Sequence, residues 1–201
     1  MGCDIHMFTE INRNIDGKPR WVNSDRWAPN PYYIYGNDDE KQYERPWECH
    51  SIYDGRNYEL FSVLANVRGH GPAILEPRGL PEDICMLTKA ENDRWCGDGH
   101  SHSYFTLREL VEHYNNNPYR DVNGYLTEED AKKLDEEGVI PEEWYYFDDG
   151  GKVYREWKMD SLIKPLIDKI KLRYKDEFYT WPENQTMEDH EKIRIVFWFD
   201  N

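Results

Sequence analysis

Two short segments, far apart in the chain, carry histidines and carboxylates at a spacing that suits metal binding. Asp4 and His6 stand two residues apart near the start, and His100 and His102 stand two residues apart near the middle, just after Asp98. Residues two apart on an extended segment project to the same side, so each segment offers a pair of ligands. Four such nitrogen and oxygen ligands would suit a divalent transition metal (Zn, Mn, Fe or Ni) better than Ca.

A metal held in this way would turn a bound water into a nucleophile at neutral pH. Asp98 is then a candidate bridging ligand or general base, and His70 or His113 is a candidate acid for the leaving group. Arg56 and Arg68 are candidate phosphate-binding residues. Together these residue types predict a metal-dependent hydrolase that acts on a phosphoester.

The same residues also have plain structural interpretations. His6 could be a histidine packed within a strand, and Asp98-Gly99 could form an ordinary turn. His100 and His102 could bond backbone groups near the start of a helix. A metal site therefore depends on whether the two segments meet in the fold.

Strands at the two ends of the chain are the elements that must position the first segment. Residues 4–12 alternate, with Asp4, His6, Phe8 and Glu10 on one face, and Asp16-Gly17 predicts a hairpin that returns over residues 18–23. Residues 192–199 form the most apolar run and predict a central strand.

Helical patterns fill most of the rest. Helices are predicted over residues 57–67, ended by Gly69, and from Pro81 to about residue 93. A capping box at Thr106–Glu109 opens a third helix. Further helices are predicted over 127–138 and 160–178, the second with Pro165 in its first turn, and a hairpin is predicted between 144–147 and 152–157.

The pattern of elements and the composition together predict one folded α+β domain over residues 1–201, with a mostly antiparallel sheet that includes both terminal strands and several packed helices. Only 38% of the residues are hydrophobic, but aromatic residues make up 15% of the chain and can each bury a large area. Residues 24–55 show no period and predict an irregular flap or insertion within this domain.

The net charge of −15 limits the partners. A chain this acidic repels the phosphates of DNA and RNA, so no nucleic-acid polymer is expected as a ligand; a cation, a basic protein partner or a small nucleotide held by a few local arginines fits better. The four cysteines form no C-x-x-C pair, and there is neither a signal peptide nor an apolar run that could span a membrane. We therefore expect a cytoplasmic protein without membrane contact.

The order D-x-H then G-H-x-H, here Asp4-Ile5-His6 and Gly99-His100-Ser101-His102, resembles the first and last motifs of calcineurin-like metallophosphoesterases. The resemblance implies a metal bound by the Asp and His residues of these motifs. The chain lacks the G-D-x-x and G-N-H-[DE] motifs of that family, so the resemblance bears on chemistry and not on fold.

Five segments in order resemble a family of small proteins encoded in tailed phages and prophages. They are MGCDIH, DGRNYELFSVLANVRG, EPRGLPED, GDGHSHSYFTLREL and RIVFWFDN, and together they span most of the chain. The resemblance implies the cytoplasm of an infected bacterium and a role in countering host defence, by degrading or sequestering a nucleotide signal. It implies no catalytic residues.

Three functions remain open from the sequence. The first is the metal-dependent phosphoesterase, acting on a nucleotide or cyclic nucleotide. The second is a non-catalytic nucleotide-binding protein, in which aromatic side chains stack on a base. The third is an acidic protein that covers a basic surface of a host factor.

Overall fold

The structure is a computed structural model that describes residues 2–31, 33, 46–69, 73–95, 97–177 and 186–201. Its contacts divide the chain into two compact units. The first unit comprises Met1–His113 and Pro165–Asn201, and the second comprises Tyr114–Lys164. The expectation of one domain over residues 1–201 stays a prediction, because compactness alone does not decide whether the two units unfold together.

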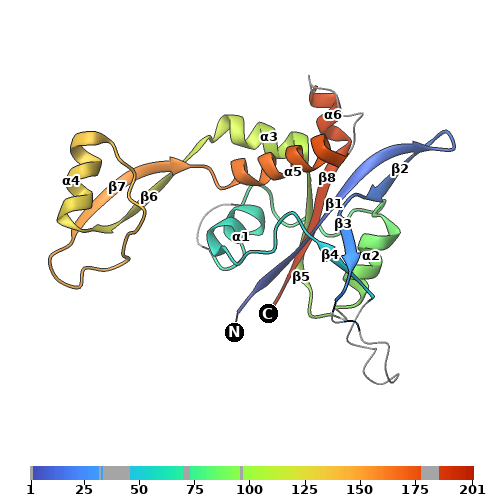
Figure 1. The fold of residues 1–201 in the computed structure, drawn as a ribbon, viewed down its shortest axis with the longest axis horizontal. Coiled ribbons are helices and arrows are strands. Elements are labelled where there is room, and N and C mark those ends of the chain that lie inside the picture. Colours follow the sequence, from blue (N-terminus) through green and yellow to red (C-terminus); the bar gives the residue numbers. More distant parts are fainter. Residues whose placement is uncertain (1, 32, 34–45, 70–72, 96, 178–185) are drawn as a thin grey trace. The chain divides into compact units, whose positions relative to one another are not determined.

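A four-stranded antiparallel sheet forms the centre of the first unit, in the order β2-β1-β8-β5 (Figure 1). The strands are β1 (Asp4–Ile15), β2 (Lys18–Asn23), β5 (His100–Thr106) and β8 (Ile193–Asp200). The two strands that carry the chain ends therefore pair in the middle of the sheet. This confirms the predicted α+β class, with a mostly antiparallel sheet that includes both terminal strands.

Local sequence explains the pairing of β1 with β2. Asp16 and Gly17 both have positive φ, at 52° and 77°, as a tight two-residue hairpin turn requires. The predicted hairpin is thus confirmed. In β8, Ile193 to Phe199 are all buried, because both faces of this strand are covered.

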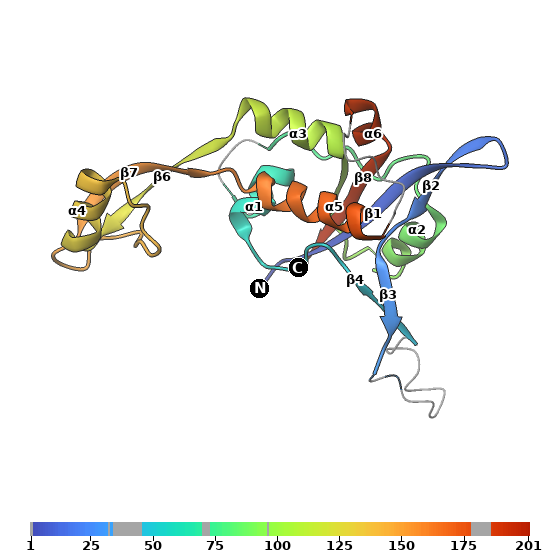
Figure 2. The same cartoon turned by 45° about the horizontal axis from the view of Figure 1, so that its top comes forward.

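Helices cover the two faces of the sheet unequally. Figures 1 and 2 show α1 (Tyr58–Ala65), α3 (Leu107–Asn116) and α5 (Ile163–Glu177) on one side, and α2 (Met86–Asp93) on the other. On the first side Phe61 packs edge-on against Phe199, with ring centroids 5.0 Å apart. The short α6 (Met187–Glu191) leads directly into β8. The side under α2 holds the polar face of β1, so it is the side on which a site can form.

Helix boundaries differ from prediction, among them those of α1 and α2, and one cap is confirmed. α1 ends at Ala65, and the capping residue Asn66 takes the left-handed conformation that was expected of Gly69. α2 begins at Met86 and not at Pro81, since residues 81–85 form turns and extended backbone. The capping box is present: Glu109 N donates to Thr106 Oγ1 at 3.1 Å, and Thr106 N donates to Glu109 Oε2 at 2.8 Å.

A buried ion pair fastens the segment before α2 to the sheet. Arg194 Nη2 lies 2.7 Å from Glu10 Oε2, and the exposed fractions of the two side chains are 4% and 0%. Arg194 Nη1 donates to Asp83 at 2.6 Å, and Cys85 N donates to Glu10 at 3.1 Å. The guanidinium also lies over the ring of Trp21. This cluster sets where α2 begins above the sheet.

Residues 24–55, predicted to be an irregular flap or insertion, contain a short ribbon in their described part. β3 (Arg26–Pro29) pairs with β4 (Trp47–His50). Asp25, at the base of the ribbon, accepts hydrogen bonds from Thr9 N and Thr9 Oγ1, and Arg173 Nη1 donates to it at 2.8 Å. Burial raises the pKa of Asp25, and these donors oppose the rise.

The second unit is a small α+β element. β6 (Tyr119–Leu126) pairs with β7 (Val153–Asp160), and α4 (Glu128–Glu137) packs on the ribbon. Its core is Val122, Leu126, Ala131 and Trp157. The predicted hairpin between 144–147 and 152–157 is wrong: the partner of β7 is β6, and Tyr145 forms only an isolated bridge to Tyr125. Among the described residues, no helix is long and apolar enough to cross a membrane.

Candidate functional site

Three neighbouring strands, β1, β8 and β5, bring polar and aromatic side chains together under α2. In the register of β1 with β8, Asp4 pairs with Asp200 and His6 pairs with Trp198, so these side chains share one sheet face. His102 reaches the same face from β5, where its ring stacks on Trp198 with centroids 6.2 Å apart. Trp198 thus lies between the two histidines.

His6 is held between two tryptophans. Its ring centroid is 4.1 Å from that of Trp95 and 5.7 Å from that of Trp198. Its Nε2 lies 3.4 Å from Asp200 Oδ2, which is close enough for attraction but not aligned as a hydrogen bond. Within the described residues, His6 Nε2 and Trp198 Nε1 are buried without a hydrogen-bond partner. Each such group costs about 1–3 kcal/mol, so a ligand that satisfied them would be favoured.

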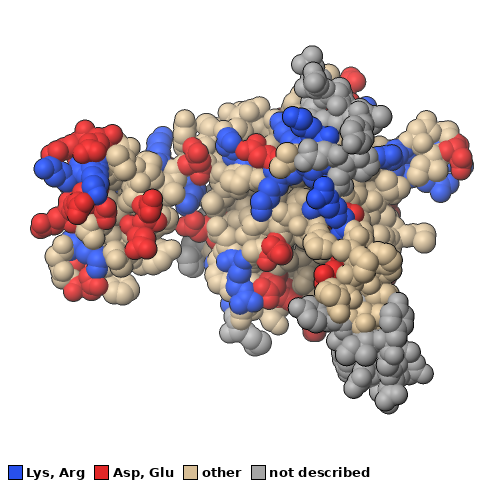
Figure 3. Space-filling view, in the orientation of Figure 1, with Lys and Arg blue, Asp and Glu red and all other residues tan. Residues whose placement is uncertain are grey.

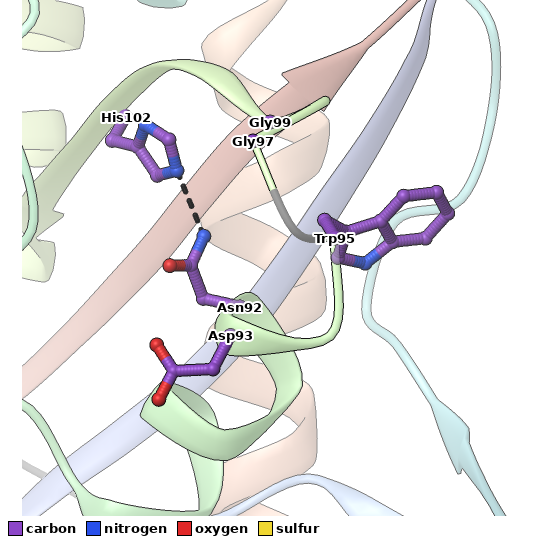
Figure 4. A pocket seen from close by; sticks show the side chains of 6 residues that line it. All are labelled: Asn92, Asp93, Trp95, Gly97, Gly99 and His102. Carbon is purple, nitrogen blue, oxygen red and sulfur yellow. Dashed lines mark hydrogen bonds between the residues drawn. The ribbon is translucent and has the colours of Figure 1, made fainter.

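A pocket of about 430 Å³ opens beside this face, between the C-terminal end of α2 and the start of β5 (Figure 4). In Figure 4 the side chains of His102 and Asn92 point toward each other, and Asn92 Nδ2 lies 2.8 Å from His102 Nε2. The pocket is lined by Asn92, Asp93, Trp95, Gly97, Gly99 and His102.

Gly99 lets the backbone lie close to the histidine and the tryptophan. A Cβ at this position would be 3.2 Å from His102 Nε2 and 3.3 Å from Trp198 Cδ1, closer than most carbon contacts. The amide–imidazole contact also fixes a tautomer. Because Asn92 Nδ2 is a donor, His102 Nε2 accepts and the ring proton sits on Nδ1. The pocket is therefore lined by the imidazole of His102, the amide of Asn92 and Trp95.

The surroundings of His102 favour its neutral form. Burial lowers its pKa, and the nearby His100 lowers it further. Protonation would place a second donor opposite the Asn92 amide and break their contact. The site is therefore complete only when His102 is uncharged.

This pKa shift predicts a pH dependence. When the pKa of a histidine is lower in the folded state than in the unfolded state, its contribution to stability is fully present above the ordinary pKa of about 6.5. This contribution is lost as the pH falls through the lowered pKa of the folded state. We expect an NMR titration of His102 to give a midpoint below about 6.5. We also expect His102→Gln to make the urea midpoint less sensitive to pH between about 7 and 5 than in the wild type. A titration midpoint at or above about 6.5 would contradict a lowered pKa of His102.

The first predicted pair of metal ligands is engaged elsewhere. Arg56 Nε and Nη2 donate to the two carboxylate oxygens of Asp4 at 2.8 and 2.6 Å. This bidentate pair occupies both the predicted metal ligand and the predicted phosphate-binding arginine. Asp4 N also donates to Asp200 at 3.2 Å.

The second pair is separated by an irregularity in β5. Ser101 has a φ of 50°, and the register with β8 shifts between His100 and Ser103. His100 therefore pairs with Phe199 and stacks on it, with centroids 6.0 Å apart, whereas His102 stacks on Trp198. Neighbouring residues of β8 face opposite sides of the sheet, so the two imidazoles do not converge.

The residues present do not fit a four-ligand metal centre. Within the described parts of the chain, no group of three or more His, Cys, Asp or Glu side chains is placed to hold a metal. His6 and His102 share a face, but Trp198 stands between them.

The other predicted site residues are scattered. Asp98 is exposed in the loop before β5, and Arg68 Nη2 donates to Asn201 Oδ1 at 2.9 Å near the chain end. His113 lies on α3, where burial lowers its pKa, and it is not part of the pocket lining. His70 lies outside the described residues.

Sequence reasoning missed four residues of the site: Asn92, Trp95, Trp198 and Asp200. Alternation along residues 193–200 could have revealed Trp198 and Asp200, since both fall on the face that pairs with Asp4 and His6. Asn92 and Trp95 gave no comparable signal, because their roles depend on where α2 crosses the sheet.

Comparison of the chain with protein-family models, curated proteins and solved structures gave no match. The functional assignment therefore depends on the geometry of the site.

Proposed function

We propose that the chain is a non-catalytic binding protein that holds a small nucleotide by its base in the pocket between α2 and β5. The observation that carries this proposal is the pairing of Asn92 with a neutral His102 at a pocket that Trp95 also lines. After its bond to His102, Asn92 keeps a carbonyl oxygen and one amide hydrogen for a ligand. A base edge complements such an amide, and a base face stacks on an indole.

The same contacts support binding better than hydrolysis. Asp4 and Arg56 neutralise each other, and His100 stacks on Phe199 whereas His102 stacks on Trp198. The metal-dependent phosphoesterase that the sequence favours stays a prediction with less geometric support. In the setting implied by the phage resemblance, the protein would sequester a nucleotide signal in the cytoplasm of an infected bacterium.

The direct test is a thermal-shift screen of the purified protein against nucleosides, nucleotides and cyclic nucleotides. We expect at least one to raise the melting temperature and to be recovered intact by mass spectrometry. Recovery of a converted product would show an enzyme instead. Absence of any shift across the panel would refute nucleotide binding.

The protein should also be free of stoichiometric metal. We expect elemental analysis of protein purified without chelator to find much less than one Zn, Mn, Fe or Ni per chain, because the predicted ligands do not converge. A His100→Ala/His102→Ala variant serves as the matched control. A full equivalent of metal in the wild type that is lost in this variant would restore the phosphoesterase prediction.

A further inference from the structure

The uncovered face of the β6–β7 ribbon in the second unit is rich in tyrosines and acids. Val122, Leu126 and Trp157 are buried in the core of this unit, and the residues that alternate with them face the other way. The register joins the outward-facing residues in four pairs: Tyr119 with Asp160, Asp121 with Lys158, Asn123 with Glu156, and Tyr125 with Tyr154.

Three tyrosines lie side by side at one end of this face. Tyr125 and Tyr145 exchange two backbone hydrogen bonds, at 2.8 and 2.9 Å, while Tyr125 pairs with Tyr154 on its other side. The rings of Tyr125 and Tyr154 meet edge-on, with centroids 5.6 Å apart. The chain continues with Tyr146 and Phe147, which are 81% and 67% exposed. We call Tyr119, Tyr125, Tyr145 and Tyr154 the tyrosine face.

Exposed apolar surface is concentrated in this unit. Of the 13 large hydrophobic side chains exposed among the described residues, seven lie in Tyr114–Lys164, which is about a quarter of the chain. Exposed aromatic surface of this kind is typical of protein–protein contacts.

Charge indicates the nature of the partner. Residues 114–164 contain seven Lys and Arg against 13 Asp and Glu, a net charge of −6, and Figure 3 shows acidic side chains interspersed with basic ones over this unit (β6, β7 and α4). A cation already lies on the tyrosine face: Lys152 Nζ is 3.9 Å from the centroid of Tyr145. A lysine or arginine from a partner could occupy an equivalent position over the other rings.

We propose that the tyrosine face docks onto a basic protein surface, whose Lys and Arg side chains lie over the tyrosine rings and pair with the acids between them. Nucleic acid and anionic membranes are disfavoured, because the unit would repel both. This interaction is separate from the nucleotide pocket, which lies in the first unit.

The test is a display selection of random peptides on the immobilised full chain. We expect enriched peptides to be rich in Lys and Arg, and the best peptide to bind the Tyr145→Ser/Tyr154→Ser variant about tenfold or more weakly. A Met86→Ser/Leu87→Ser variant, which changes exposed apolar side chains of the first unit, should bind as the wild type does. High salt should weaken the interaction.

A second variant keeps the test independent of folding. Glu156→Lys reverses one exposed charge on the same face and leaves the core unchanged. It should also weaken binding of the peptide. The proposal is overturned if no peptide is enriched, if enriched peptides lack basic residues, or if they bind the wild type, the tyrosine variant and Glu156→Lys equally.

Discussion

Replacing Arg194 with Met is expected to lower the free energy of unfolding by about 3–5 kcal/mol. Among the described residues, Arg194 is the only salt-bridge partner of Glu10, and the substitution removes it. The side chain of Glu10 is fully buried. An unpaired carboxylate at such a position retains its desolvation cost without the compensating attraction. Urea denaturation followed by far-UV circular dichroism measures the loss.

Two controls separate this effect from a general loss of charge. Lys89→Met removes an ion pair with Asp93 in which both side chains are more than half exposed, and should cost less than about 1 kcal/mol. Arg194→Met combined with Glu10→Leu should recover much of the loss, because no buried charge is left unpaired. The interpretation fails if Arg194→Met and Lys89→Met have the same small effect.

The same substitution should weaken ligand binding. Arg194 donates a hydrogen bond to Asp83, and Glu10 accepts one from the backbone N–H of Cys85. Asp83 and Cys85 lie immediately before α2. Loosening this segment shifts the helix that carries Asn92 over the pocket. A loss of nucleotide affinity in Arg194→Met would show that the Arg194–Glu10 ion pair supports the pocket lined by Asn92.

The second large effect is expected at Trp95. Trp95→Ala should weaken binding of a nucleotide found in the thermal-shift screen by about 10- to 100-fold, because stacking of a base on an aromatic ring contributes about 1–3 kcal/mol. Loss of Trp95 also removes one of the two rings that hold His6. Isothermal titration calorimetry on both proteins gives the ratio directly.

Trp47→Ala is the matched control for this experiment. Trp47 is 53% exposed on β4 and does not line the pocket, so its removal should leave the affinity unchanged. Equal affinities for the wild type and both variants would place the ligand at another site.

Much of the fold was predictable because its signals are local. The Asp16-Gly17 turn, the Thr106–Glu109 capping box and the apolar run of β8 each depend on residues close in sequence. The pairing of β6 with β7 was missed, because the two strands are separated by α4 and a loop. The α2 start was also misplaced, since Pro81 gives a helix signal that the chain does not use.

The site was less predictable, because it depends on contacts between distant segments. The pairing of Asp4 with Arg56 spans 52 residues and left no pattern in the sequence. The positive φ of Ser101, which separates His100 from His102, overrode the simple alternation expected of an extended segment. One half of the expectation holds: His6 and His102 do reach the same face of the sheet.

The most direct test of the binding proposal is an NMR titration that follows the indole N–H signals of the eight tryptophans as nucleotide is added. The proposal predicts that the signals of Trp95 and Trp198 move and saturate together, that Trp47 does not move, and that the nucleotide stays intact. Saturable binding that leaves Trp95 and Trp198 unchanged, or the appearance of signals from a hydrolysed product, would contradict it.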